Sequence, residues 1–220
     1  MTEDLDDLIR RTDPDRWLSS RFIGDAAARA DVIALYAYDY ELARAPKVAS
    51  NSLLGEIRLT WWREVLDEVF EGRPVRRHPT AQALADVVRR HGLPREPLEA
   101  MIDARYRELD AAPMDPSEAL AWARDTGGRA AELAAMILAP GAEAGPARAA
   151  GTAWSMSRRA ETAPALAPMA EKTLGGARKA VRSLDARAFP AVAHAALAAR
   201  RGAPVLDRLR LIWAVACGRI

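Results

Sequence analysis

Apolar positions along the chain recur with the period of an α-helix. Leu53, Ile57, Trp61, Val65 and Val69 follow one another at intervals of four residues, which places them on one helical face. Alternating runs of β-branched residues, the signature of strands, do not occur, and the residues that dominate are the helix formers Ala, Leu, Arg and Glu. The pattern predicts an all-α protein.

Prolines and glycines divide this pattern into segments of helix length. Asp13-Pro14 and Asp115-Pro116-Ser117-Glu118 each place an acidic N-cap before a first-turn proline, and the second adds a capping-box glutamate. After the helix that opens at Pro14, we expect helices over about 26–44, from a cap at Ser50 or Asn51 to Gly72, and over 80–90, 94–109, 116–138, 146–160, 168–184, 190–201 and 205–216. No repeat, linker or change of composition interrupts the series, so residues 1–220 are predicted to form a single domain.

Charge and cysteine content exclude several classes of function. The formal net charge is +2 over 220 residues, and the arginine pairs are short and scattered, so we expect no nucleic-acid partner. Cys217 is the only cysteine, which rules out an internal disulfide and a cysteine-based zinc site. No window approaches the roughly 18 apolar residues of a membrane span. We expect a cytoplasmic protein without a transmembrane segment, able to make peripheral contact with the inner membrane.

Three stretches carry a family resemblance. Residues 34–47 read ALYAYDYELARAPK and precede a helix with the pair Trp62-Arg63, residues 122–133 read WARDTGGRAAEL, and residues 150–164 read AGTAWSMSRRAETAP. In their order and spacing they resemble the squalene/phytoene synthase family, over a core of about 16–215. The resemblance implies an isoprenoid-synthase-type helical bundle around a central cavity.

Enzymes of that family ionise allylic diphosphates with Mg²⁺, which aspartates four residues apart on facing helices hold. Where the first of these motifs is expected, this chain reads Ala43-Arg44-Ala45-Pro46-Lys47, and where the second is expected Glu161 is the one carboxylate of Ser157–Thr162. Bases repel a divalent cation at short range. The sequence therefore predicts that the Asp-rich motifs that bind Mg²⁺ and diphosphate are lost, with no catalytic or metal-binding residue and no cofactor.

Within the family, the chain most resembles the branch that contains a mitochondrial complex I assembly factor. That resemblance implies a non-catalytic scaffold or assembly factor whose partners are respiratory-complex subunits or other assembly factors, with an apolar isoprenoid ligand or none. One alternative is an active head-to-head prenyl transferase of the phytoene or squalene synthase type, which requires Mg²⁺. Another is a helical adaptor whose own side chains fill the cavity.

The resemblance also nominates residues that line the cavity. They are aromatic side chains, one arginine, one hydroxyl and one glycine: Tyr36, Tyr40, Arg58, Trp61, Trp62, Thr126, Gly128 and Trp154. For the aromatic members, packing in the core is the competing interpretation. For Gly127 and Gly128, a close approach of helices and space for a ligand are equally supported, since glycine destabilises a helix interior.

For the remaining polar residues we expect structural rather than catalytic roles. We expect Asp39 to form an ion pair with Arg58 or another base. The three histidines, His78, His91 and His194, lie in separate segments and are predicted to be surface residues without a metal role. Cys217 has no neighbouring base to activate it, and we expect it to be a small apolar packing residue.

Overall fold

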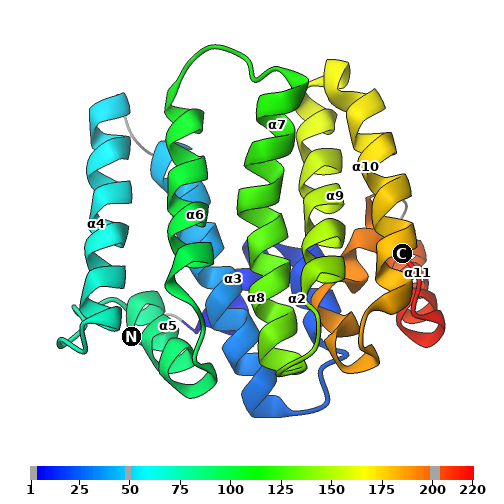
Figure 1. Cartoon of the computed structure of the whole chain (residues 1–220), viewed down its shortest axis with the longest axis horizontal. Helices are drawn as coiled ribbons and strands as arrows, with labels where there is room; N and C mark the ends of the chain where they lie inside the picture. The colour runs from blue at the N-terminus through cyan, green and yellow to red at the C-terminus, as the bar shows by residue number, and fades with distance from the viewer. Residues whose placement is uncertain (1–3, 48–50, 199–203) are drawn as a thin grey trace.

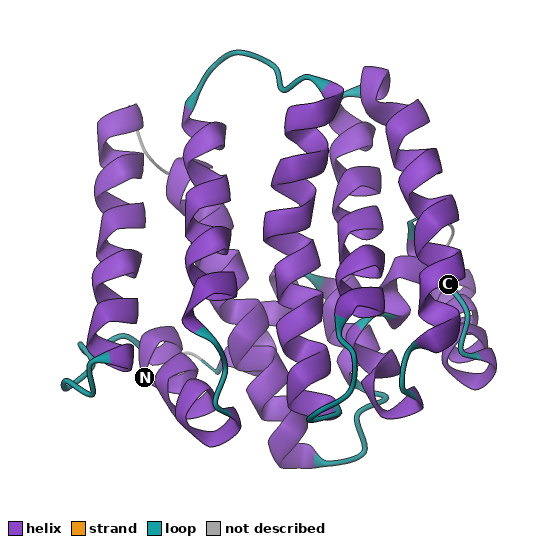
Figure 2. Cartoon of the chain, in the orientation of Figure 1, coloured by secondary structure: helices purple, strands orange, loops and turns teal. Residues whose placement is uncertain are grey.

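The computed structural model describes residues 4–47, 51–198 and 204–220, and the described residues contain helices and no strand (Figure 2). The predicted all-α class is confirmed. The eleven α-helices of these ranges are α1 (Leu5–Thr12), α2 (Pro14–Ser20), α3 (Ala26–Lys47), α4 (Ser52–Phe70), α5 (Pro79–His91), α6 (Arg95–Tyr106), α7 (Pro116–Ala123), α8 (Arg129–Leu138), α9 (Gly145–Thr162), α10 (Ala167–Ala180) and α11 (Pro204–Cys217). None of these described helices is long and apolar enough to cross a membrane.

Helix α3 is the central element of the bundle. Helices α4, α6, α7 with α8, α9 and α10 stand side by side, and α3 runs behind them (Figure 1). Helix α3 contacts α1, α4, α5, α6 and α8, and the consecutive residues 31–39 are all buried. A helix surrounded on nearly every side cannot be amphipathic, so its sequence is apolar around most of its circumference.

Local capping explains where several helices begin. The Asp13 side chain accepts a hydrogen bond from the Arg16 backbone N–H at the start of α2, and Asn51 accepts one from Leu54 at the start of α4. Asp115 and Glu118 form the complete capping box of α7. These predicted starts are confirmed, because each depends on side chains within three residues of the backbone groups that they satisfy.

Three segments differ from the expectation. Helix α3 continues through Pro46 to Lys47, so the proline, which has no N–H to donate to the carbonyl of Leu42, lies in its last turn. Helix α1, which the sequence analysis did not predict, precedes α2. In place of the helix predicted over 190–201, the chain forms two 3₁₀ helices, η5 (Ala186–Ala191) and η6 (Ala193–Leu197), because Pro190 interrupts α-helical hydrogen bonding; residues 199–201 lie outside the described residues.

Glycines bring α8 and α9 unusually close together. Helices α7 and α8 form one rod joined by a π-helical turn, η2 (Arg124–Gly128). A Cβ atom on Gly151 of α9 would lie 2.1 Å from the Gly127 carbonyl oxygen, and a Cβ on Gly128 would lie 2.6 Å from Thr152 Oγ1. Both distances are shorter than van der Waals contact. The glycines of this turn therefore serve the close approach of the two helices.

Candidate functional site

A central cavity of about 450 Å³ lies between α2, α3, α6, α7, η2 and α9. Four of the eight residues nominated from the sequence line it: Tyr36 and Tyr40 from α3, Thr126 from η2, and Trp154 from α9. Gly127, and not Gly128, is the glycine in the cavity wall. Whether any of these residues touches a substrate remains a prediction.

A buried network of charges forms one wall of this cavity. Arg16 Nη1 donates to Asp39 Oδ2 at 2.5 Å, and Arg105 Nη2 donates to Asp39 Oδ1 at 2.8 Å. Arg105 also donates to Glu108 at 2.6 Å. Asp39, Arg16 and Arg105 are each no more than 5% exposed. The predicted ion pair of Asp39 with a base is thus present, but its partners are Arg16 and Arg105, while Arg58 lies elsewhere.

This network keeps Asp39 ionised. Burial alone raises the pKa of the Asp39 carboxyl, but the two guanidinium groups outweigh burial and bring its pKa down to about 2. Both carboxylate oxygens of Asp39 are occupied by arginine donors. The Asp39 carboxylate therefore links α2, α3 and α6 through its two ion pairs.

Bases dominate the rest of the cavity wall. Ala43 and Lys47 follow Asp39 by one and two helical turns and line the same cavity. Helix α9 contributes Arg158 and Arg159, whose guanidinium carbons lie 5.9 Å from the Trp154 ring and 5.3 Å from the Trp122 ring respectively. The described lining residues include five bases and three carboxylates, so the cavity has an excess of positive charge.

Aromatic rings surround the Arg16 side chain in the cavity wall. The Arg16 guanidinium carbon lies 4.4 Å from the Trp154 ring centroid, and His194 meets the same ring edge-on at 5.0 Å. His194 is fully buried, and neither of its ring nitrogens has a hydrogen-bond partner among the described residues. Burial, and secondarily Arg16, lowers the pKa of His194 well below its usual value. The expectation that His194 is a surface residue is wrong. Its small apolar neighbours Ala193 and Ala195 are buried as well, so this part of η6 packs in the core.

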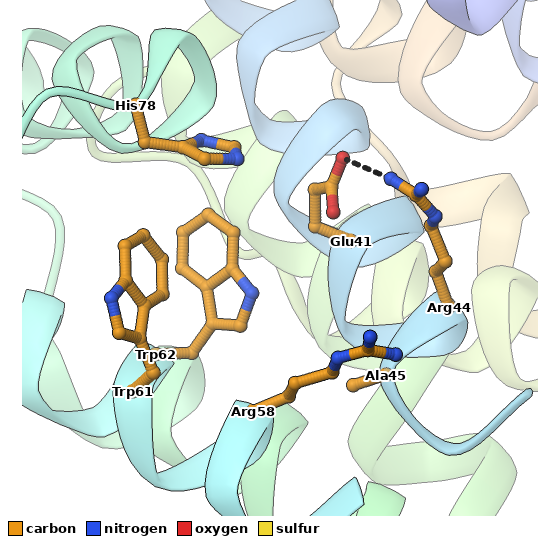
Figure 3. Close-up of a pocket in the computed structure, with 7 residues that line it drawn as sticks. All are labelled: Glu41, Arg44, Ala45, Arg58, Trp61, Trp62 and His78. Atoms are coloured by element: carbon orange, nitrogen blue, oxygen red, sulfur yellow. Dashed lines mark ion pairs between the residues drawn. The ribbon is translucent and has the colours of Figure 1, made fainter. Parts of the chain in front are cut away.

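The other nominated side chains belong to a second pocket, of about 250 Å³, on the opposite side of α3. Arg58, Trp61 and Trp62 from α4 line it together with Glu41, Arg44, Ala45 and His78 (Figure 3). The Trp61 and Trp62 rings meet edge-on at 5.0 Å, and His78 lies 5.3 Å from Trp62. The structure does not bring these side chains together with Tyr36 and Trp154. The two pockets are separate.

Several residues of the central cavity escaped the sequence analysis. Arg16 and Arg105 carry no local motif, and their importance arises from ion pairs with Asp39 of α3 that the sequence does not reveal. Cys217 was expected to pack in the core but is exposed. In the described part of the chain, no three His, Cys, Asp or Glu side chains are grouped closely enough to hold a metal ion.

Comparison with known proteins identifies the family. A family model described as squalene/phytoene synthase matches residues 9–160, which is more than half of the chain and includes α3, η2 and most of α9. The chain belongs to the squalene/phytoene synthase family. The predicted family resemblance is confirmed.

The chain is also similar to curated relatives and to a solved structure. A bovine protein named "NADH dehydrogenase (ubiquinone) complex I, assembly factor 6" is 32% identical over 104 residues, and its human counterpart of the same name is 30% identical over 104 residues. Each match covers 47% of this chain and 31% of the relative's length. A crystal structure of a dehydrosqualene synthase superposes with a TM-score of 0.77 at 12% identity, over 97% of this chain and 94% of that chain. It shows that the isoprenoid-synthase-type fold is shared.

Proposed function

We propose that this squalene/phytoene synthase family member does not transfer prenyl groups and acts instead in the assembly of respiratory complex I. The observation that carries the first half is the state of Asp39, whose carboxylate oxygens both accept hydrogen bonds from buried arginines. The name of the relatives carries the second half. Its partners are then subunits of the complex or other assembly factors, at a cytoplasmic site next to the inner membrane.

The donor set of the central cavity does not fit a magnesium cluster. Mg²⁺ prefers near-octahedral oxygen ligands, usually carboxylates and water. At one and two turns after Asp39, the cavity wall offers Ala43 and Lys47, and α9 offers Arg158, Arg159 and hydroxyl groups. The positive charges oppose the binding of a divalent cation in a partly buried site. We therefore infer that the chain needs no metal cofactor.

An enzyme assay tests the first half of this proposal. The purified chain is incubated with farnesyl or geranylgeranyl diphosphate and Mg²⁺, and release of diphosphate is followed. We expect no release above the rate without protein. Turnover at rates typical of enzymes, on the order of 1 s⁻¹ or more, would instead establish the alternative, an active head-to-head prenyl transferase, for which the shared fold is the supporting observation.

A genetic experiment tests the second half independently. Deletion of the gene should reduce the amount of fully assembled complex I, measured on native gels and as NADH-dependent quinone reduction in membranes. Reintroduction of the wild-type chain should restore both. Normal complex I in the deletion strain would refute a role in assembly, whatever the outcome of the enzyme assay.

The cavity wall also bears on the ligand that the chain could retain. Aromatic rings from Tyr36, Trp122 and Trp154 lie beside the bases Arg158 and Arg159, an arrangement suited to an isoprenoid with an anionic head group held without metal. We expect farnesyl diphosphate to bind in the presence of a chelator, detected by calorimetry, and binding to weaken at least about ten-fold in the Arg158→Ala/Arg159→Ala variant. Absence of binding would favour a purely structural scaffold.

A further inference from the structure

Helix α11 exposes four large apolar side chains on one face. Leu206, Leu209, Ile212 and Trp213 are between 51% and 56% exposed. At 100° per residue these four side chains fall within an arc of about 120° on one side of the helix. The opposite side, with Leu211 and Ala214, is buried in the main core. Helix α11 therefore packs one apolar side against the body of the protein and exposes a second apolar side to solvent.

Arginines border this apolar arc on both sides. Arg208 and Arg210 each lie about 40° beyond one of its edges, and Arg219 follows the helix. Arg208 and Arg219 are exposed, whereas Arg210 pairs with Asp207 at 3.0 Å. Asp207 is half-buried and is the one acidic residue of the segment 204–220. The exposed side of α11 thus combines leucine, isoleucine and tryptophan with positive charge.

We propose that the apolar arc of α11 docks the protein on an anionic phospholipid surface. A helix that lies in the membrane interface inserts a Trp- and Leu-containing face between lipid head groups and directs arginines toward the phosphates. Trp213 suits this position, since an indole ring has an apolar body and a polar N–H. The helix lies at the outer edge of the molecule (Figure 1), where a planar surface can reach it.

Charge argues against a second copy of the chain as the occupant. A two-fold dimer built on α11 would bring the same face of two molecules together. The arginines at the edges of one arc would then meet arginines of the other copy, because the described segment offers no exposed carboxylate to pair with them. An anionic lipid surface satisfies both the apolar arc and its positive border.

Vesicle binding tests this proposal without reference to complex I, so its failure is distinguishable from failure of the proposed function. The full chain is sedimented with vesicles of phosphatidylcholine containing phosphatidylglycerol, and with vesicles of phosphatidylcholine alone. We expect binding to the anionic vesicles that weakens as salt is added. Leu209→Ser/Ile212→Ser should weaken it at least about ten-fold, and Arg208→Gln about five-fold.

A matched control lies on α4. Leu54 and Ile57 are also exposed, at 41% and 54%, but on another side of the molecule. The variant Leu54→Ser/Ile57→Ser should bind the anionic vesicles like the wild type, and thermal melts followed by circular dichroism verify that every variant is folded. No binding by the wild type, equal binding to neutral vesicles, or an equal loss in the α4 variant would overturn the proposal. So would light scattering that shows a wild-type dimer that the α11 variant converts to monomer.

Discussion

Two opposite faces of α3 carry acidic residues in contrasting environments. Asp39 faces the central cavity and is held by two arginines in a fully buried network. Glu41 faces the second pocket and forms an ion pair with Arg44 of the next helical turn, at 3.7 Å, where the Arg44 side chain is 52% exposed and that of Glu41 15%. The same chemical group, two residues apart, thus joins three helices on one face and is a half-buried carboxylate with one weak ion pair on the other.

The comparison concerns the part of α3 where the family resemblance leads us to expect metal ligands. Asp39, Ala43 and Lys47 share the cavity face of α3, and the arginines that meet Asp39 come from α2 and α6. A carboxylate with two charge-assisted hydrogen bonds contributes to stability only while it is ionised and dry. The charged network in the wall of the central cavity is therefore part of the folded core.

The largest effect is expected for Asp39→Asn. The substitution leaves the guanidinium groups of Arg16 and Arg105 buried without their common counter-charge, and removal of one partner from a buried ion pair costs about 3–5 kcal/mol. Urea denaturation measures the loss as a lower midpoint. A loss below about 1 kcal/mol would show that the network behaves like a surface ion pair and would remove the contrast between the two faces.

Acid provides a second view of the same carboxylate. The pKa of Asp39 is about 2 in the folded protein against a usual value of 3.8, so its stabilising contribution is complete above about pH 4 and is lost as the pH falls toward 2. The difference in unfolding free energy between the wild type and Asp39→Asn should therefore shrink across that interval. A difference that stays constant from pH 5 to the acid limit would contradict the depressed pKa.

The next effect concerns the glycines behind the cavity. In Gly151→Ala, the new methyl group would lie 2.1 Å from the Gly127 carbonyl oxygen and 2.6 Å from the Ala131 Cβ. Since two backbones must separate, we expect a loss of about 1–3 kcal/mol or more, seen as a lower Tm. Gly175→Ala on α10, where nothing lies within 4 Å of the new atom, should instead stabilise by about 0.5–1 kcal/mol. Equal Tm shifts in the two variants would refute the close-approach explanation.

The difference between the two faces also marks what a sequence can reveal. The caps at Asp13, Asn51 and Asp115 were predictable because the groups that they satisfy lie within three residues. The family stretches were recognisable for a similar reason, since each is continuous. The network around Asp39 was not, because Arg105 lies 66 residues away and nothing in its own neighbourhood indicates burial.

The nominated aromatic residues illustrate a second limit. Tyr36 and Tyr40 point to the central cavity, whereas Trp61 and Trp62 point to the second pocket. Helical periodicity assigns residues to faces of one helix, but it does not say which side of α3 receives α4. His194 shows the converse error, because it was expected at the surface, whereas it is completely buried together with the alanines on either side.

A third, smaller effect concerns His194. Burial lowers the pKa of His194 in the folded protein. The unfolded chain therefore binds a proton at a pH where the folded protein does not, and stability falls as the pH drops below about 6.5. The unfolded chain takes up most of this proton between about pH 7.5 and 5.5, so the decline begins in that interval. The His194→Leu variant should lack this part of the decline in denaturant midpoint. Parallel curves for the variant and the wild type would show that the imidazole is protonated in the folded state.

The smallest effect is expected for Glu41→Gln, the same change from carboxylate to amide as in Asp39→Asn but on the other face of α3. An ion pair between residues three apart on a helix, with one partner half in solvent, contributes about 0.2–0.5 kcal/mol, and salt screens it further. We expect a midpoint of urea unfolding within that margin of the wild type. A loss comparable to that of Asp39→Asn would mean that the second pocket depends on its charges as strongly as the central cavity does, and that burial is not what separates the two faces.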